Sequence, residues 1–296
     1  MKTFSASWRA RCYSIAILVL FLGSWEWAVY WFNWSALILP APSRIGATFI
    51  NGILSGYFWP HFLQTTYEVI CGLLLGGSLG FILGVLLGQS RFWQAVLMPY
   101  VLTSQVIPKL ALAPLLTLWL GFGFLPMVVI TALVCFFPVL ENTLTGLQQT
   151  DKARLELFKM LGASRWQTLW RLKLPIGLPY TLSGLRVAAV LALVGAIVGE
   201  FIGANKGLGA LIIAAQGTMD TALMFAVLIL ITLLGLCLYY LTLALQRLIL
   251  HFYLPFSYTK VIYEEYIEVD KKYQKEEALS LAKSKLNRVL NKLEEN

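Results

Sequence analysis

The chain has 296 residues, of which 58% are hydrophobic and only 13% are charged, and its formal net charge is +8. Soluble domains carry nearly twice this share of charged residues, and residues 69–90 and 110–140 contain no ionisable side chain at all. Because about 20 apolar residues in a helix cross the hydrocarbon of a bilayer, the composition excludes a soluble protein and predicts a polytopic membrane protein.

Six membrane-spanning helices are predicted, at about residues 13–32, 62–88, 94–119, 124–141, 181–203 and 221–249. The first is expected to be a retained span, since its apolar run is long and no small-residue cleavage site follows it. After it, Ser43 is expected to cap a short helix over residues 44–56 on the membrane surface.

Glycine recurs at every fourth position of the second predicted span. This spacing places five glycines on nearly one face of a helix and lets another helix approach closely. The partner helix is either in the same subunit or in a second copy of the chain. The five residues are Gly72, Gly76, Gly80, Gly84 and Gly88.

The third predicted span is interrupted by Pro99, Pro108 and Pro114. Proline is tolerated in a spanning helix where neighbouring groups satisfy the freed carbonyls, so we expect a broken or kinked segment. Lys109 lies beside the expected break, and Glu200 lies near the end of the fifth span. Ionisable residues inside a membrane are costly and commonly face a pathway, although a structural ion pair or a lysine that reaches the interface is equally open. With Gln105, these two are the candidate pathway residues.

The distribution of basic residues predicts the orientation. One set of span ends carries twelve basic residues, and the opposite set carries Arg44 and Lys206. Both termini and the 151–175 loop are therefore expected in the cytoplasm. The twelve are Lys2, Arg9, Arg11, Arg91, Lys152, Arg154, Lys159, Arg165, Arg171, Lys173, Arg186 and Arg247.

Residues 151–175 form the most charged loop between the apolar segments. Asp151 or Thr150 can cap a helix that runs to Leu161, and Gly162 can end it in a left-handed turn. Ser164 can cap a second short helix that reaches about Lys173, where Pro175 stops the pattern. Two short amphipathic helices would make a compact knob that can insert into a groove of a soluble partner.

Chemistry-bearing motifs are otherwise scarce. The sequence contains no phosphate-binding loop of the G-x4-G-K-[ST] type, no Cys/His metal cluster and no hydrolase elbow. The four cysteines are far apart and are interpreted as small core residues. We therefore expect no cofactor or metal on this chain and no ATPase site, so that ATP with Mg²⁺ would act on a partner. We expect no nucleic-acid partner either, because the positive charge serves topology.

The chain is predicted to divide into a membrane domain (1–257) and a cytoplasmic tail (258–296). Residues 260–296 carry eight basic and eight acidic residues, and leucines recur there at roughly helical spacing. This pattern is typical of an amphipathic helix or a short coiled coil. The tail is either a regulatory or partner-binding segment or a solvated appendage.

The spacing of Glu156, Gly162 and Leu174-Pro175 (E-x5-G-x9-[IL]-x-L-P) resembles the loop by which permease subunits of bacterial ABC importers grip their ATPases, although Leu157 and Phe158 replace the two usual alanines. LPAPSRI (39–45), IPKLALAPLLTLWLGFG (107–123) and VGEFIGANKGLGALI (198–212) extend the likeness. Residues 1–257 as a whole resemble the binding-protein-dependent permeases of the nitrate, sulfonate, taurine, bicarbonate and thiamine-precursor type, and the tail lies outside this resemblance.

This resemblance implies an all-α type I importer permease with six spans, located in the bacterial inner membrane as a homodimer. Two ATPase subunits would bind below and a substrate-binding protein outside. It also implies that residues Glu156 to Arg165 contact the ATPase. The coupling residues expected on this basis are Glu156, Gly162, Ala163, Ser164, Arg165, Trp166 and Pro175.

The solute is not readable from the sequence. Small anions such as nitrate, sulfonate or bicarbonate suit Lys109, and a thiamine-precursor pyrimidine or a related heterocycle is the alternative. An ATP-independent secondary transporter would need coupling-ion residues in mid-membrane and no ATPase-binding knob, so it is disfavoured. A membrane enzyme would need a polar cluster at the interface, and the sequence contains none.

Overall fold

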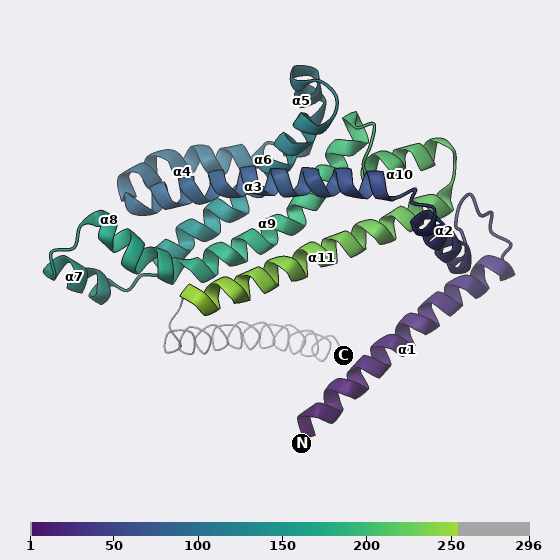
Figure 1. Ribbon diagram of the computed structural model, residues 1–296, viewed down its shortest axis with the longest axis horizontal. Helices are drawn as coiled ribbons and strands as arrows, with labels where there is room; N and C mark the ends of the chain where they lie inside the picture. Colours follow the sequence, from purple (N-terminus) through teal and green to yellow (C-terminus); the bar gives the residue numbers. More distant parts are fainter. Residues whose placement is uncertain (1, 254–296) are drawn as a thin grey trace, which may run out of the picture. The chain divides into compact units, whose positions relative to one another are not determined.

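The computed structural model describes the backbone of residues 2–253 and the side chains of residues 12–252 (Figure 1). The chain forms two compact units, residues 1–243 and 244–296, and the packing described below belongs to the first. Within the described part, every regular element is a helix. The predicted tail at 258–296 lies outside the described residues.

Within residues 2–253, five helices are long and apolar enough to cross a membrane, and a bent pair makes a sixth span if its two parts count as one. The predicted helical membrane fold and its spans are therefore confirmed. The five are α1 (Lys2–Trp31), α3 (Trp59–Gln89), α6 (Phe124–Gln148), α9 (Leu174–Gly203) and α11 (Thr221–Tyr253). The fifth predicted span begins earlier than expected, at Leu174 rather than at 181.

The bent pair contains the expected break. Helix α4 (Arg91–Val106) ends just before Pro108, and a short 3₁₀ helix, η1 (Lys109–Leu112), leads into α5 (Ala113–Leu120). The two parts are inclined at 74°. Pro108 has extended backbone angles, as a residue without an N–H commonly does at a helix boundary. Gly121 and Gly123, both with positive φ, then form the turn into α6.

Helices α3, α6 and α9 pack along one another and form the centre of the first unit (Figure 1). The glycine stripe of α3 faces α6: a Cβ atom on Gly76 would lie 2.2 Å from the carbonyl oxygen of Ala132, and one on Gly80 would lie 2.4 Å from that of Phe136. Gly146 of α6 and Gly177 of α9 make a similar close contact. Glycine is thus required because the helix backbones touch.

Helix α2 (Pro42–Leu54) is the short helix expected after the first span. Its N-cap is Ala41, not Ser43, so the predicted cap is wrong. Ser43 is the second residue of the helix, and both its N–H and its hydroxyl donate to the Glu26 carboxylate of α1. The cap is supplied by another helix, which the local sequence does not reveal.

Helix α10 (Leu208–Gly217) follows α9 directly and packs against α9 and α3. Its buried residues Leu208 and Leu211 belong to the main hydrophobic cluster, together with residues of α3, α6, α9 and α11. Alanine is common on the buried face of α9, for example Ala188, Ala192 and Ala196. These small side chains let α9 sit deep within this cluster.

Candidate functional site

The first candidate site is the segment Asp151–Lys173, which we call the coupling knob. Its first helix, α7 (Lys152–Met160), begins at Asp151, whose side chain accepts a hydrogen bond from the N–H of Ala153 at 3.2 Å. None of the α7 residues is fully buried. The helix is short and apolar on one side only, so it depends on its caps for a fixed shape.

Gly162 ends α7 with φ of +70°. The N–H of Gly162 donates to the carbonyl of Lys159 at 3.0 Å, and the N–H of Ala163 donates to that of Phe158 at 2.9 Å. This pair of bonds is the Schellman arrangement, which satisfies the last carbonyls of a helix and requires a left-handed residue. Ser164 then starts α8 (Arg165–Thr168) through a capping box, in which the side chains of Ser164 and Gln167 each bind the other's backbone N–H.

The second helix of the knob does not stop at Pro175, contrary to the prediction. After α8, a π-helical turn, η2 (Leu169–Lys173), passes straight into α9, so that residues Arg165–Gly203 form a continuous helical path. Pro175 is the second residue of α9 and follows the π turn directly, where the helical bonding already departs from the i→i−4 pattern that a proline would interrupt. Pro175 therefore marks the junction between knob and span and not the end of a helix.

The outer surface of the knob is open and the inner surface is anchored. Glu156, Arg165 and Trp166 are exposed, and Met160 is 85% exposed. On the inner side, Leu169 and Leu172 are buried, and Lys173 donates from Nζ to the carbonyl of Gly88 at the end of α3 at 3.4 Å. Exposed apolar side chains on a charged loop are typical of a surface that binds another protein.

The other members of the expected coupling set also belong to this element. Ala163 is half-buried beneath the turn, while Gly162 and Ser164 are exposed. The structure thus brings Glu156, Gly162, Ala163, Ser164, Arg165 and Trp166 into one small element, with Pro175 just beyond it.

The second candidate site surrounds the break in the α4–α5 span. Lys109 is half-buried, and its Nζ lies 6.0 Å from the centre of the Phe137 ring on α6, at the outer limit for a cation–π contact. Gln105 is half-buried on the last turn of α4. Glu141 lies one turn beyond Phe137 on α6 and is exposed. The prediction missed Glu141, although it stands within the apolar run of α6.

The third candidate site joins the end of α9 to α3. The carboxylate of Glu200 accepts a hydrogen bond from Thr65 Oγ1 at 2.6 Å and one from the N–H of Gly209 at 2.5 Å. Thr65 in turn accepts from the N–H of Leu208 at 2.8 Å. Glu200 is therefore bound to α3 and to the first turn of α10, and only 1% of its surface is exposed.

Glu68 of α3 belongs to the same cluster and was missed by the sequence-based prediction. It is completely buried, its Oε1 accepts from Gln64 Nε2 at 2.8 Å, and its carboxyl group lies against that of Glu200. Its position inside the second predicted span could have revealed it, since a charged residue there is unusual. Lys109 and Glu200, named together as pathway candidates, are parts of two different sites.

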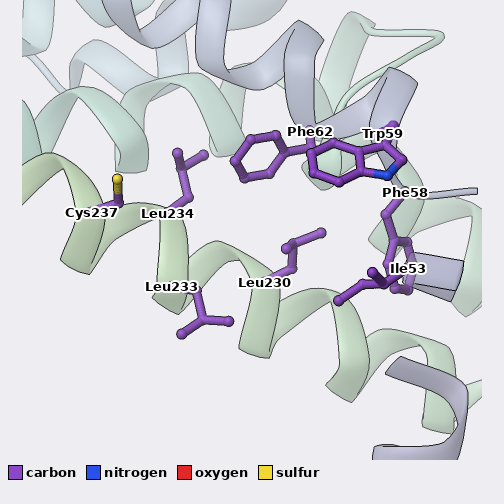
Figure 2. Close-up of a pocket in the computed structure, with 8 residues that line it drawn as sticks. All are labelled: Ile53, Phe58, Trp59, Phe62, Leu230, Leu233, Leu234 and Cys237. Carbon is purple, nitrogen blue, oxygen red and sulfur yellow. The ribbon is translucent and has the colours of Figure 1, made fainter. Parts of the chain in front are cut away.

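An apolar hollow of about 310 Å³ lies between the α2–α3 connection and α11 (Figure 2). Phe58, Trp59 and Phe62 lie opposite Leu230 and Leu234 of α11. Its lining carries no charged side chain, and it contains none of the candidate pathway residues. Among the described residues, no group of three His, Cys, Asp or Glu side chains is placed to hold a metal ion.

Apolar spans, a broken membrane segment and an anchored, protruding knob define the membrane-embedded subunit of a transporter. Residues 76–251 match the family described as "Binding-protein-dependent transport system inner membrane component". The chain belongs to this family. It is a permease subunit of an ABC transporter, and in such transporters separate subunits hydrolyse ATP.

Several curated relatives support this assignment. A "Probable ABC transporter permease protein" of Haemophilus influenzae is 37% identical over 76% of this chain and 91% of its own length. The "Riboflavin transport system permease protein RibX" of Chloroflexus aurantiacus is 37% identical over 78% and 87%. The "Formylaminopyrimidine transport permease protein ThiX" of Halalkalibacterium halodurans is 38% identical over 67% and 79%.

The fold is also similar to that of solved structures. A chain of a bacterial ABC transporter involved in the import of the acidic polysaccharide alginate superposes with a TM-score of 0.57, covering 81% of this chain and 98% of that one, at 15% identity. At this identity the similarity concerns the fold alone. It confirms the type I importer permease architecture.

Proposed function

We propose that this chain is the permease of an ATP-driven importer, acting as a homodimer with two ATPase subunits and an external binding protein. The observation that carries the proposal is the coupling knob, whose exposed surface includes Glu156, Met160 and Trp166 while Leu169 and Leu172 are buried beneath it. A knob that is free outside and fixed inside can follow a moving partner and pass on the movement.

The route of transmission is the continuous helix from α8 through η2 into α9. Closure of the ATPase dimer on ATP would displace the knob, and α9 would move with it as a rigid element. The spans would then alternate between openings to the two sides of the membrane, so that a solute released by the binding protein is passed to the cytoplasm. This is alternating access between two discrete packings.

We place the knob and both termini on the cytoplasmic side. The support is the excess of basic residues at one set of span ends, twelve against Arg44 and Lys206 at the other. In this orientation α10 and α2 lie at the external mouth, where the binding protein docks.

We place the translocation pathway along the face of α6 that carries Phe137 and Glu141, opposite the break with Lys109 and Gln105. These polar groups lie within apolar spans and are not fully buried in the single chain. Charged residues in a membrane commonly face a water-filled cavity. Glu200, by contrast, is completely engaged by α3 and α10, and this supports a role in holding helices and not in contacting solute.

For the solute, we favour an aromatic heterocycle, because two relatives that are at least 37% identical carry riboflavin and formylaminopyrimidine in their names. A small anion such as a sulfonate is the second candidate, and Lys109 is the observation that favours it. Uptake of each candidate solute into vesicles, measured with the cognate binding protein, distinguishes the heterocycle from the anion. If the solute is anionic, Lys109→Met lowers uptake at least tenfold, whereas Lys109→Arg retains most of it.

The proposed function is tested by ATPase activity of the assembly in lipid. Stimulation by loaded binding protein should be lost in Glu156→Ala and in Gly162→Pro, while Gly23→Ala in α1 leaves the ATPase attached and stimulated. Solute uptake that continues without any ATPase would overturn the importer assignment and favour a secondary transporter.

A further inference from the structure

Glu68 and Glu200 are two acidic side chains that meet inside the protein. They come from different helices, α3 and α9, and are 0% and 1% exposed. Their carboxyl groups lie against each other. Two ionised carboxylates in contact inside a protein repel each other, so a close buried pair favours a proton on one of them.

The surrounding donors show which of the two is ionised. Glu200 accepts from Thr65 Oγ1 and from the backbone N–H of Gly209, at the N-terminus of the ten-residue helix α10. Backbone N–H donors and the positive end of the helix dipole both stabilise a negative charge. Glu200 is therefore the carboxylate of the pair.

Glu68 has the opposite environment. Its Oε1 accepts from Gln64 Nε2 at 2.8 Å. Its Oε2 is buried and receives no hydrogen bond from the described residues, and this is the position that an acid proton directed at Glu200 would take. The interactions given for the two carboxyls include no lysine or arginine, so a second negative charge here would be uncompensated and costly.

We propose that Glu68 and Glu200 form a proton-binding site that holds one proton, on Glu68, and that this proton fastens the α9–α10 turn to α3. The turn is already tied to α3 by Thr65 and by His61, whose Nδ1 lies 3.0 Å from the carbonyl oxygen and 3.2 Å from the nitrogen of Gly207. Loss of the proton would leave two buried carboxylates in contact and would push α3 and the turn apart.

Two other residues with ionisable side chains, His61 and Lys206, belong to the elements that surround the pair. His61 lies on α3, and Lys206 lies in the turn itself, where its side chain is exposed. Helices α5 and α6 approach this end of α9 with Thr117 and Met127, which do not titrate. A titration of the cluster therefore involves Glu68, Glu200 and His61, and substitution separates their contributions.

The test is infrared spectroscopy of the purified permease in phospholipid vesicles at neutral pH. A protonated carboxyl group has a carbonyl stretching band distinct from that of a carboxylate. We expect the band in the wild-type protein and in Glu141→Gln, which alters an exposed acid, and its loss in Glu68→Gln. A wild-type protein without the band, or a band that survives in Glu68→Gln, overturns the proposal.

Thermal unfolding of the same samples gives a second readout. An amide at position 68 still accepts from Gln64 and donates to Glu200, so Glu68→Gln should melt within a few degrees of the wild type. Glu200→Gln directs an amide toward N–H donors and should melt much lower. Equal destabilisation by the two variants would contradict a proton on Glu68. Neither measurement requires solute or ATPase, so this inference can fail while the importer function stands.

Discussion

Glu26 of α1 accepts two hydrogen bonds from Ser43 of α2, one from the backbone nitrogen at 3.0 Å and one from Oγ at 2.7 Å. A negative charge at the start of a helix is stabilised by the unpaired N–H groups and the helix dipole. The single interaction therefore caps α2 and connects it to the first span.

Replacing Glu26 should loosen this connection. Glu26→Ala removes both bonds, and for a partly exposed group we expect a cost of about 1 kcal/mol or less. Proteolysis of the connection at residues 32–41 should become up to about fivefold faster, following the shift in the local equilibrium. The double variant Glu26→Ala/Ser43→Ala should be cleaved by the protease no faster than Glu26→Ala alone. Fully additive effects would show that the two residues act independently.

Gly76→Ala should be among the most harmful single-methyl changes in the chain. The new Cβ would lie 2.2 Å from a backbone oxygen of α6, so one helix must move. We expect a cost of about 1–3 kcal/mol from overpacking, measured as a lower melting temperature in detergent. Gly23→Ala in α1 is the matched control, because no atom lies within 4 Å of its new methyl group. Equal melting of the two variants would contradict the close packing of α3 on α6.

Gly207→Ala should disturb the end of α9. The residue has φ of +136°, and a Cβ there would lie 2.2 Å from the Glu200 carboxyl carbon. The variant should unfold at lower temperature and lose transport. Gly217→Ala, at the other end of α10, meets nothing within 4 Å and should behave as the wild type. A harmless Gly207→Ala would mean that the turn can rearrange without loss.

Gly162→Ala should fray the end of α7 without any steric clash, since no atom lies within 4 Å of the new methyl group. An L-residue in the left-handed region costs roughly 1–2 kcal/mol. Hydrogen exchange at the Ala163 amide should accelerate by about 5- to 30-fold. Gly162→Asn should show a smaller effect, because asparagine tolerates this conformation. Identical exchange rates in the wild type, Gly162→Ala and Gly162→Asn would show that the left-handed conformation of Gly162 does not determine the stability of the turn.

The spans and the break were predictable because their signals are local. Twenty apolar residues and a proline at 108 act on their own stretch of chain, and the structure bends there by 74°. The glycine stripe predicted a close contact but not its partner, since periodicity shows a face and not what covers it. The structure places α6 of the same chain against it.

The sequence-based predictions were wrong or incomplete where contacts with residues elsewhere in the chain determine the local structure. Ser43 was predicted to cap its own helix, but a carboxylate 17 positions earlier does so. Glu68 was overlooked because its place in a buried acidic pair depends on Glu200, which lies on another helix. Pro175 was expected to end a helix, yet the preceding π turn carries the path through it.

The uninterrupted path Arg165–Gly203 has a mechanical consequence. At 1.5 Å per residue, the 30 residues of α9 extend over about 45 Å. The knob precedes one end of this helix, and Glu200, with its hydrogen bonds to Thr65 and Gly209, is close to the other. A displacement of the knob, as proposed for the importer, would therefore be carried along α9 toward the contacts of Glu200 with α3 and α10.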